Sequence, residues 1–234
     1  MPTSGGLVNP AAEVGRIARE AGALYLLDAT QVVGQLHVDV DDLGCDMLTA
    51  TGRKFLRGPR GTGLLWVGDN ALERLKPHVV EIASATWDGD QGYNWAAGAR
   101  RFETWENSYV NVLGLGAAVQ EALDIGLEAI EARARALGRR LRDQLSELPD
   151  VTVHDLGVDK CAIVTAAVSD LSAVDIAGAL ARQHINVSTT VPHDNPLDTG
   201  ERDVHPLLRF SPHYYNTEAE IDRAAHAVGE LARF

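Results

Sequence analysis

The fold is decided by residues 23–67, which read ALYLLDATQVVGQLHVDVDDLGCDMLTATGRKFLRGPRGTGLLWV. Three short apolar runs stand in this stretch, at residues 23–27, 45–51 and 63–67. Short strands that are almost wholly apolar are typical of a parallel sheet covered on both faces. Because loops and helix-like segments separate the runs, the pattern predicts an α/β fold with a mostly parallel sheet.

Two chemically active side chains follow these runs. Asp28 ends the first run, and Lys54 comes directly after the second. Ligands of open α/β sheets bind at the carboxyl ends of the strands, so both residues are expected at that edge. The segment TGRKFLRGPRGTG at 51–63 also fits a solvated basic loop or an anion site. It is not a Walker A loop, because the glycine spacing before Gly-Lys-Ser/Thr is missing.

One cofactor would use this whole set of groups. Pyridoxal phosphate needs a lysine for its Schiff base and an acid that keeps the pyridine nitrogen protonated, so that the ring accepts electrons. It also needs hydroxyl and guanidinium groups that hold the phosphate. Residues 23–67 supply each of these chemical groups near Lys54. The sequence therefore favours a cofactor site over a solvated loop at this position.

Further along, the chain changes character twice. Residues 69–103 show few periodic signals and predict a long, partly irregular segment. An apolar stripe at three- and four-residue steps then predicts helix within 107–148, where the arginines between 133 and 142 read as a solvated face. Strands and two helices are expected beyond it, with Ser172 and Asn216 or Thr217 as helix caps.

The predicted domains are 1–106, a partial cofactor-binding large domain; 107–148, an interdomain helical segment; and 149–234, a small α+β domain.

Composition narrows the function classes. The 234 residues carry a formal net charge of −12, which disfavours nucleic acid as a partner. No apolar run is long enough to predict a membrane span, and no signal peptide is visible, so we expect a cytoplasmic protein. The two cysteines, Cys45 and Cys161, lie in apolar runs and are expected to be core residues. We predict no metal site.

The ordered blocks described above resemble the class V aminotransferase family of fold-type I pyridoxal-phosphate enzymes. The likeness continues through RFETWE at 101–106 and LRFSPHYYNTE at 208–218, and so covers essentially the whole chain. That family includes cysteine desulfurases, isopenicillin N epimerase-like proteins and the C–S lyase of ergothioneine synthesis. The blocks at 101–106 and 213–218 look most similar to the ergothioneine-pathway branch.

The resemblance implies a cofactor, pyridoxal 5'-phosphate, and a role for each matching residue. Lys54 would be the catalytic Schiff-base lysine. Asp28 would pair with the pyridine nitrogen, and Gln31 would lie near the ring hydroxyl. Thr51 would bind the phosphate, and Arg53, where many relatives have histidine, would face it too.

The resemblance also implies an amino-acid substrate and a reaction type. Arg209 would bind the substrate carboxylate, a role that suits a planar, bidentate donor. Desulfurases of the family carry a nucleophilic cysteine in a loop that corresponds to residues 188–205, and no cysteine stands there. A C–S lyase or an aminotransferase is therefore favoured over a persulfide-forming desulfurase. Family members are usually homodimers, so a homodimer is expected.

Relatives have roughly another domain half before the turn at residues 2–6, so the resemblance implies an N-terminally truncated member. That expectation leaves an alternative open: a truncated or partner-dependent subunit that keeps the lysine but is catalytically incomplete. A nucleotide-binding domain that uses the loop at 58–63 is a weaker alternative, because no Gly-x-Gly-x-x-Gly motif follows a strand.

Overall fold

The computed structural model describes residues 1–190, 193, 196 and 206–233, which form two compact units. Pro10–Ile125 is called the lysine unit, because it contains Lys54; Met1–Asn9 together with Gly126–Phe234 is called the arginine unit, because it contains Arg209. The division falls at Gly126, inside the helical segment 107–148. The three-part domain division stays a prediction.

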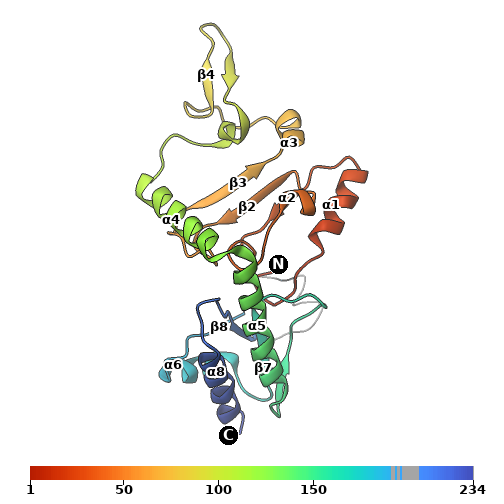
Figure 1. Cartoon of the computed structure of the whole chain (residues 1–234), viewed down its shortest axis with the longest axis vertical. Helices are drawn as coiled ribbons and strands as arrows, with labels where there is room; N and C mark the ends of the chain where they lie inside the picture. The colour runs from red at the N-terminus through yellow and green to blue at the C-terminus, as the bar shows by residue number, and fades with distance from the viewer. Residues whose placement is uncertain (191–192, 194–195, 197–205, 234) are drawn as a thin grey trace. The chain divides into compact units, whose positions relative to one another are not determined.

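The lysine unit alternates helices and strands, as the α/β expectation requires (Figure 1). Its elements are α1 (Ala11–Glu20), β1 (Leu26–Asp28), α2 (Val40–Leu43), β2 (Met47–Thr51), β3 (Gly63–Val67), α3 (Asp69–Arg74), β4 (Ala85–Trp87), β5 (Tyr93–Trp95), the 3-10 helix η1 (Gly98–Phe102) and α4 (Tyr109–Ile125).

The main sheet of this unit has the order β1-β2-β3. β1 runs parallel to β2, but β3 runs antiparallel to it, with Thr51 opposite Gly63. The prediction of a mostly parallel sheet is therefore wrong for β3. A parallel return needs a crossover of a dozen or more residues, usually helical, whereas β2 and β3 are joined by a loop that turns straight back.

β1 differs from the buried strand that residues 23–27 predicted. It spans only three residues, and Leu26 is 54% exposed. The reason is its place in the sheet: β1 is an edge strand and pairs only with β2 among the described strands. An apolar run indicates that a strand is suited to burial, but its actual burial depends on the strands and helices that pack beside it.

Residues 69–103 hold more regular structure than predicted. They form α3, an antiparallel hairpin of β4 and β5, and η1. The hairpin loop contains Gly89, whose φ of 94° lies in the left-handed region that favours glycine. A short loop with Gly89 and Gly92 between Trp87 and Tyr93 is the hairpin signal that the sequence analysis missed.

The arginine unit is a four-stranded antiparallel sheet with helices. Its sheet has the order β6-β7-β9-β8. The elements are α5 (Leu127–Ser146), β6 (Val151–Val153), β7 (Val164–Val168), α6 (Ala173–Arg182), β8 (Ser188–Thr189), β9 (Leu208–Phe210) and α8 (Glu218–Leu231). The predicted Ser172 cap is confirmed, and of the two predicted candidates Asn216 and Thr217 the cap of α8 is Thr217, which forms a capping box with Glu220.

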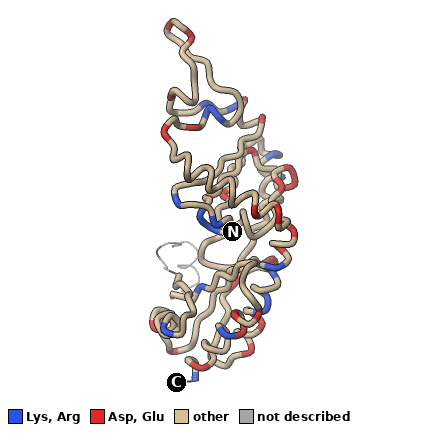
Figure 2. Tube along the Cα trace, turned by 60° about the vertical axis from the view of Figure 1, so that its left-hand side comes forward, with Lys and Arg blue, Asp and Glu red and all other residues tan. Residues whose placement is uncertain are grey.

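The core of the arginine unit is built around the predicted stripe of α5. Leu137, Leu141 and Leu145 are each at most 1% exposed, and they join a cluster with β7, β9, α6 and α8. Acidic residues recur along both units and do not gather in one place (Figure 2). Within the described ranges no single helix is long and apolar enough to span a membrane, and only α4 and α5 taken together meet that test of length and composition.

Candidate functional site

Asp28 and Thr51 stand at the same edge of the lysine-unit sheet, at the ends of the parallel strands β1 and β2. Asp28 lies opposite Thr49, two residues before Thr51. The Asp28 carboxylate is at the surface, where its Oδ1 atom accepts a hydrogen bond of 2.9 Å from the backbone N–H of Thr30. The turn after β1 therefore holds this carboxylate at the edge where open α/β sheets bind ligands.

Gln31 lies in that turn and is 5% exposed. Three residues later, Gly34 has a φ of 93°, and a Cβ atom there would lie 2.5 Å from the backbone nitrogen of Leu56. No side chain fits at that distance, so the turn packs directly on the backbone that follows Lys54. Two segments predicted to act together, 28–34 and 54–56, are thus adjacent in space.

The loop that carries Lys54 is closed by its own backbone. The N–H of Gly52 donates to the carbonyl of Thr62, and the N–H of Gly58 donates to the carbonyl of Gly52, each at 2.8 Å. The Lys54 carbonyl accepts from the N–H of Arg57, whose φ of 60° marks a tight left-handed turn. The loop is therefore a built structure that presents the half-buried Lys54 in one place.

Helix α4 covers one side of this loop. Arg57 forms an ion pair of 2.8 Å with Glu121 of α4. Gly114 of α4 meets the ring of Pro59 so closely that a Cβ atom would lie 2.8 Å from it. These contacts assign Arg57 to holding the loop against the helix and leave Arg53, which is exposed, as the arginine beside Lys54.

Thr51 carries an observation that points to a ligand. Its hydroxyl oxygen is buried and has no hydrogen-bond partner among the residues that the structure describes. A buried hydroxyl without a partner is costly, and most such groups in native proteins are satisfied. Arg53 likewise forms no ion pair with a described residue. Thr51 and Arg53 are therefore two donors without a fixed acceptor among the described residues, and both lie in the segment that carries Lys54.

Arg209 lies in β9 of the arginine unit, half-buried between Leu208 and Phe210. Its Nε–H donates a hydrogen bond of 2.6 Å to the carbonyl of Thr3. Burial lowers the pKa of its guanidinium, and none of the carboxylates in the described part of the chain pairs with it. A half-buried cation without an acid is a suitable partner for a small carboxylate.

A buried ion pair near Arg209 was missed by the sequence analysis. Asp155 has a fully buried side chain and pairs with Arg142 at 2.6 Å. Asp155 also accepts hydrogen bonds from the backbone N–H of Gly6 and from the N–H and hydroxyl of Thr165. The prediction that Arg142 belongs to a solvated helix face is wrong, because this arginine is 8% exposed. No local signal distinguishes it from the exposed arginines beside it.

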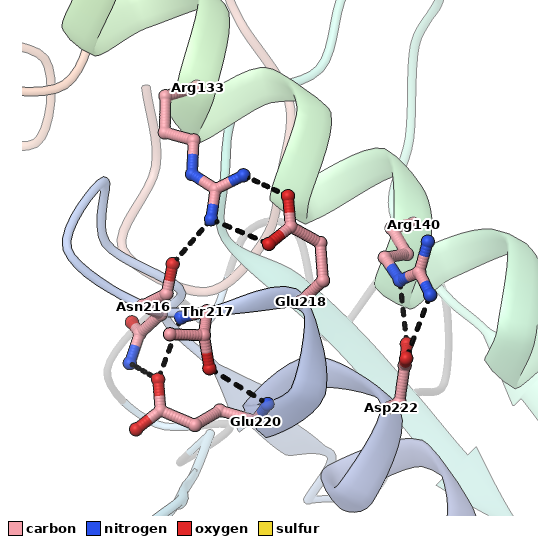
Figure 3. Close-up of polar contacts among 7 residues, drawn as sticks. All are labelled: Arg133, Arg140, Asn216, Thr217, Glu218, Glu220 and Asp222. Carbon is pink, nitrogen blue, oxygen red and sulfur yellow. Dashed lines mark hydrogen bonds and ion pairs between the residues drawn. The ribbon is translucent and has the colours of Figure 1, made fainter.

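Two other arginines of α5 hold the start of α8 (Figure 3). Arg133 pairs with Glu218, and Arg140 forks onto Asp222 with hydrogen bonds of 2.6 and 2.7 Å. These hydrogen bonds lower the pKa of Glu218 and of Asp222 to about 2 each. These four side chains therefore hold α8 against α5. A neighbouring pocket of about 360 Å³ is lined in part by Asn216 and Glu220, which are hydrogen-bonded to each other in the same helix cap.

Both cysteines are buried, as expected from the sequence. Cys45 is 7% exposed and Cys161 is 0% exposed, and burial raises the pKa of each thiol. A raised pKa and an inaccessible sulfur both oppose thiolate chemistry. Within the described ranges there is also no group of three or more His, Cys, Asp and Glu side chains that could hold a metal ion.

The structure therefore brings Asp28, Gln31, Thr51, Arg53 and Lys54 to one end of the lysine unit, and it places Arg209 in the other unit.

The family profile described as "Aminotransferase class-V" matches residues 1–224 of the chain. The chain is 34% identical over 232 residues to a "Probable cysteine desulfurase" of Halalkalibacterium halodurans, covering 98% of this chain and 56% of that protein.

Two solved structures are similar over nearly the whole chain. The apo cysteine desulfurase of Thermococcus onnurineus NA1 matches with a TM-score of 0.91 at 26% identity, over 100% of this chain and 58% of that one. The cystine C-S lyase C-DES, in complex with its product cysteine persulfide, matches with a TM-score of 0.81 at 28% identity, over 99% of this chain and 59% of that one. A C-DES variant has glycine covalently linked to its PLP cofactor. The chain thus spans little more than half the length of the relatives that it matches.

Proposed function

Because this chain belongs to the class V aminotransferase family, we propose that it carries the lysine and the substrate-binding arginine of a pyridoxal-phosphate-dependent C–S lyase. The family uses pyridoxal phosphate, and the relatives described above are cysteine desulfurases and a C–S lyase.

The residues of the lysine unit fit the cofactor. The partnerless Thr51 hydroxyl and the exposed Arg53 would hold the phosphate. The Asp28 carboxylate, held at the strand end, would keep the pyridine nitrogen protonated, and Gln31 would lie near the ring hydroxyl. Lys54 would bind the cofactor covalently. When bound, pyridoxal phosphate supplies an electron sink for the bonds at the substrate Cα.

The remaining steps belong to residues of this chain. Arg209 would bind the substrate carboxylate and so orient the substrate. The Lys54 amine would take the Cα proton as a general base. The Cβ–S bond then breaks and its electron pair leaves with sulfur. With one water, a substrate R–S–CH2–CH(NH2)–COOH gives R–SH, pyruvate and ammonia.

One observation carries the choice of a lyase over a persulfide-forming desulfurase: both of the chain's cysteines are buried in the cores of their units. A desulfurase needs an accessible thiolate that attacks the substrate sulfur, and neither thiol meets that need. We therefore propose that sulfur leaves with the substrate fragment. A cysteine conjugate or its sulfoxide is the proposed substrate class, in keeping with the likeness of residues 101–106 and 213–218 to the ergothioneine-pathway branch.

The test is a product analysis of the purified chain with pyridoxal phosphate and a panel of L-cystine, L-cysteine and cysteine-conjugate sulfoxides. Pyruvate that forms in step with a released sulfur fragment supports the proposal. The double variant Cys45→Ala/Cys161→Ala should keep its rate within about threefold, because core cysteines act as small apolar residues. Alanine as the product, or a persulfide trapped on Cys45 or Cys161, would show a desulfurase instead.

A second candidate function is a catalytically incomplete subunit that needs a further polypeptide. It is favoured by the apolar side chains that the lysine unit leaves exposed, among them Tyr109, Val110 and Leu113 of α4 at 73%, 80% and 74%. The absorbance of the chain with added pyridoxal phosphate discriminates the two. An absorbance band of lysine-bound pyridoxal phosphate that disappears in Lys54→Ala supports the lyase. Absence of any such band supports the incomplete subunit.

A further inference from the structure

Residues 6–8 lie antiparallel to residues 159–161 in the arginine unit and are called the added strand, although they form only an isolated bridge. The carbonyl of Gly6 accepts from the N–H of Cys161 at 2.8 Å, and the N–H of Val8 donates to the carbonyl of Asp159 at 3.0 Å. Leu7 forms an antiparallel bridge with Lys160. This strand places the Thr3 carbonyl against the Nε–H of Arg209. The orientation of Arg209 therefore depends on where the added strand is fixed.

The strand is fixed by Asp155. Its carboxylate accepts the Gly6 N–H at 3.0 Å, three residues after Thr3. The same carboxylate accepts the N–H and the hydroxyl of Thr165, at 3.0 and 2.7 Å, and Thr165 lies directly opposite Arg209 in the pairing of β7 with β9. One buried side chain thus ties together the two chain segments that flank Arg209.

The contact with Thr3 also decides which edge of the guanidinium remains for a ligand. The Nε–H of Arg209 donates to the Thr3 carbonyl, and no described residue accepts a hydrogen bond from its two Nη atoms. A carboxylate can bind two guanidinium nitrogens at once, and such bidentate pairs demand a fixed geometry. The Nη edge of Arg209 is therefore the edge that would receive the carboxylate of an amino acid.

We propose that Asp155 is a positioning residue: through the Gly6 N–H and Thr165 it holds Arg209 with its Nη edge toward the substrate carboxylate. The inference rests on the proposed function, since it takes Arg209 as the group that binds the substrate. It assigns to Asp155 and its partner Arg142 a role in substrate affinity, with no part in the bond-breaking steps.

Neighbouring glycines offer a matched pair of variants. A Cβ atom at Gly6 would lie 2.3 Å from Nη2 of Arg142, 2.5 Å from the Ile163 carbonyl and 2.9 Å from Asp155. A Cβ atom at Gly5 would meet nothing closer than 3.8 Å. Neither glycine has a φ in the left-handed region. Gly6→Ala should push the strand away from Asp155, while Gly5→Ala changes the same segment without that displacement.

The direct readout is the Nε–H NMR signal of Arg209 in the full chain, assigned by its loss in Arg209→Lys. In the wild-type chain and in Gly5→Ala this proton should exchange slowly with water, because Thr3 accepts it. In Gly6→Ala it should exchange at least about tenfold faster, since the open form becomes populated. With pyridoxal phosphate bound, the KM for L-cystine should rise at least about tenfold in Gly6→Ala with little change in kcat, as expected when binding alone is lost.

The outcomes separate the inference from the proposed function. If Arg209→Lys leaves the KM unchanged, the role of Arg209 in the proposed function fails. If Arg209→Lys raises the KM but Gly6→Ala matches Gly5→Ala in exchange and in KM, the positioning role of Asp155 is wrong.

Should Gly6→Ala fail to fold, Thr165→Val takes its place, because it removes one hydrogen bond to Asp155 with an isosteric side chain. It should shift both readouts in the same direction by about threefold, and no shift in either would overturn the inference.

Discussion

The two units are of nearly equal length but bury their apolar side chains very differently. Ten of the buried hydrophobic residues lie in the lysine unit and twenty-three in the arginine unit, within the described part of the chain. Of the large hydrophobic residues that are exposed, sixteen lie in the lysine unit and five in the arginine unit. Within the described part of the chain, the lysine unit therefore has the smaller core and more exposed apolar side chains.

The two units also hold their proposed functional residues in different ways. Arg209 is held by a unit with a dense core and a buried ion pair. Lys54 is held by local devices: the hydrogen bonds of its loop, the close approach of Gly34 and the cover of α4. We infer that the arginine unit holds Arg209 through its own core, whereas the position of Lys54 depends more on local hydrogen bonds and close backbone contacts.

The largest effect is expected in the core of the arginine unit. Leu141→Ala removes a side chain that is 1% exposed and should destabilise the unit by about 2 to 5 kcal/mol. Its matched control is Leu113→Ala in α4, which removes a side chain that is 74% exposed and should change stability by no more than about 0.5 kcal/mol. Urea unfolding combined with hydrogen exchange measures both units. An equally large loss in Leu113→Ala would show that α4 is covered in solution and would break the comparison.

A smaller loss is expected where the turn meets the lysine loop. Gly34→Ala places a Cβ atom 2.5 Å from the backbone of Leu56 at a φ of 93° and should cost about 2 to 3 kcal/mol. Gly61→Ala shares a positive φ, of 81°, but meets nothing within 4 Å, so it should cost only about 1 kcal/mol. Thermal unfolding gives the difference. Equal costs would mean that the turn does not pack on the loop as described.

The smallest effect concerns the acid sensitivity of the arginine unit. The pKa of Asp222 is lowered to about 2, chiefly by the hydrogen bond from Arg140. Such a depressed pKa adds stability above the ordinary carboxyl range, and this contribution is lost as the pH falls from about 4 toward 2. Asp222→Asn should therefore flatten the pH dependence of unfolding in that window, by a modest amount because the pair is solvent-exposed. Asp143→Asn, which removes a surface carboxylate that forms no ion pair with a described residue, is the matched control.

The same contrast shows what sequence patterns can predict. The stripe of α5, the strand at 63–67 and a helix cap at Asn216 or Thr217 depend on local spacing, and each was predicted. The order of Asp28, Thr51 and Lys54 placed these residues at one sheet edge, because parallel strands end together. The direction of β3 and the exposure of Leu26 depended on pairing partners, and there the prediction was wrong.

The positioning network is the clearest case of information that local patterns lack. Arg142 closely follows the exposed Arg139 and Arg140 in α5, and only the fold brings Asp155 and the Gly6 N–H to it. Whether a charged side chain is buried depends on a partner distant in sequence, and spacing along one helix does not reveal that partner.

The central claim is that Lys54 is the cofactor lysine, and borohydride trapping tests it most directly. The chain contains three lysines, Lys54, Lys76 and Lys160, so each can be followed by peptide mass spectrometry after reduction with pyridoxal phosphate present. We predict a reduced phosphopyridoxyl group predominantly on Lys54, its loss in Lys54→Ala and its retention in Lys76→Ala. Labelling of Lys54 that is no greater than that of Lys76 and Lys160, or a label that persists in Lys54→Ala at the wild-type level, would contradict the claim.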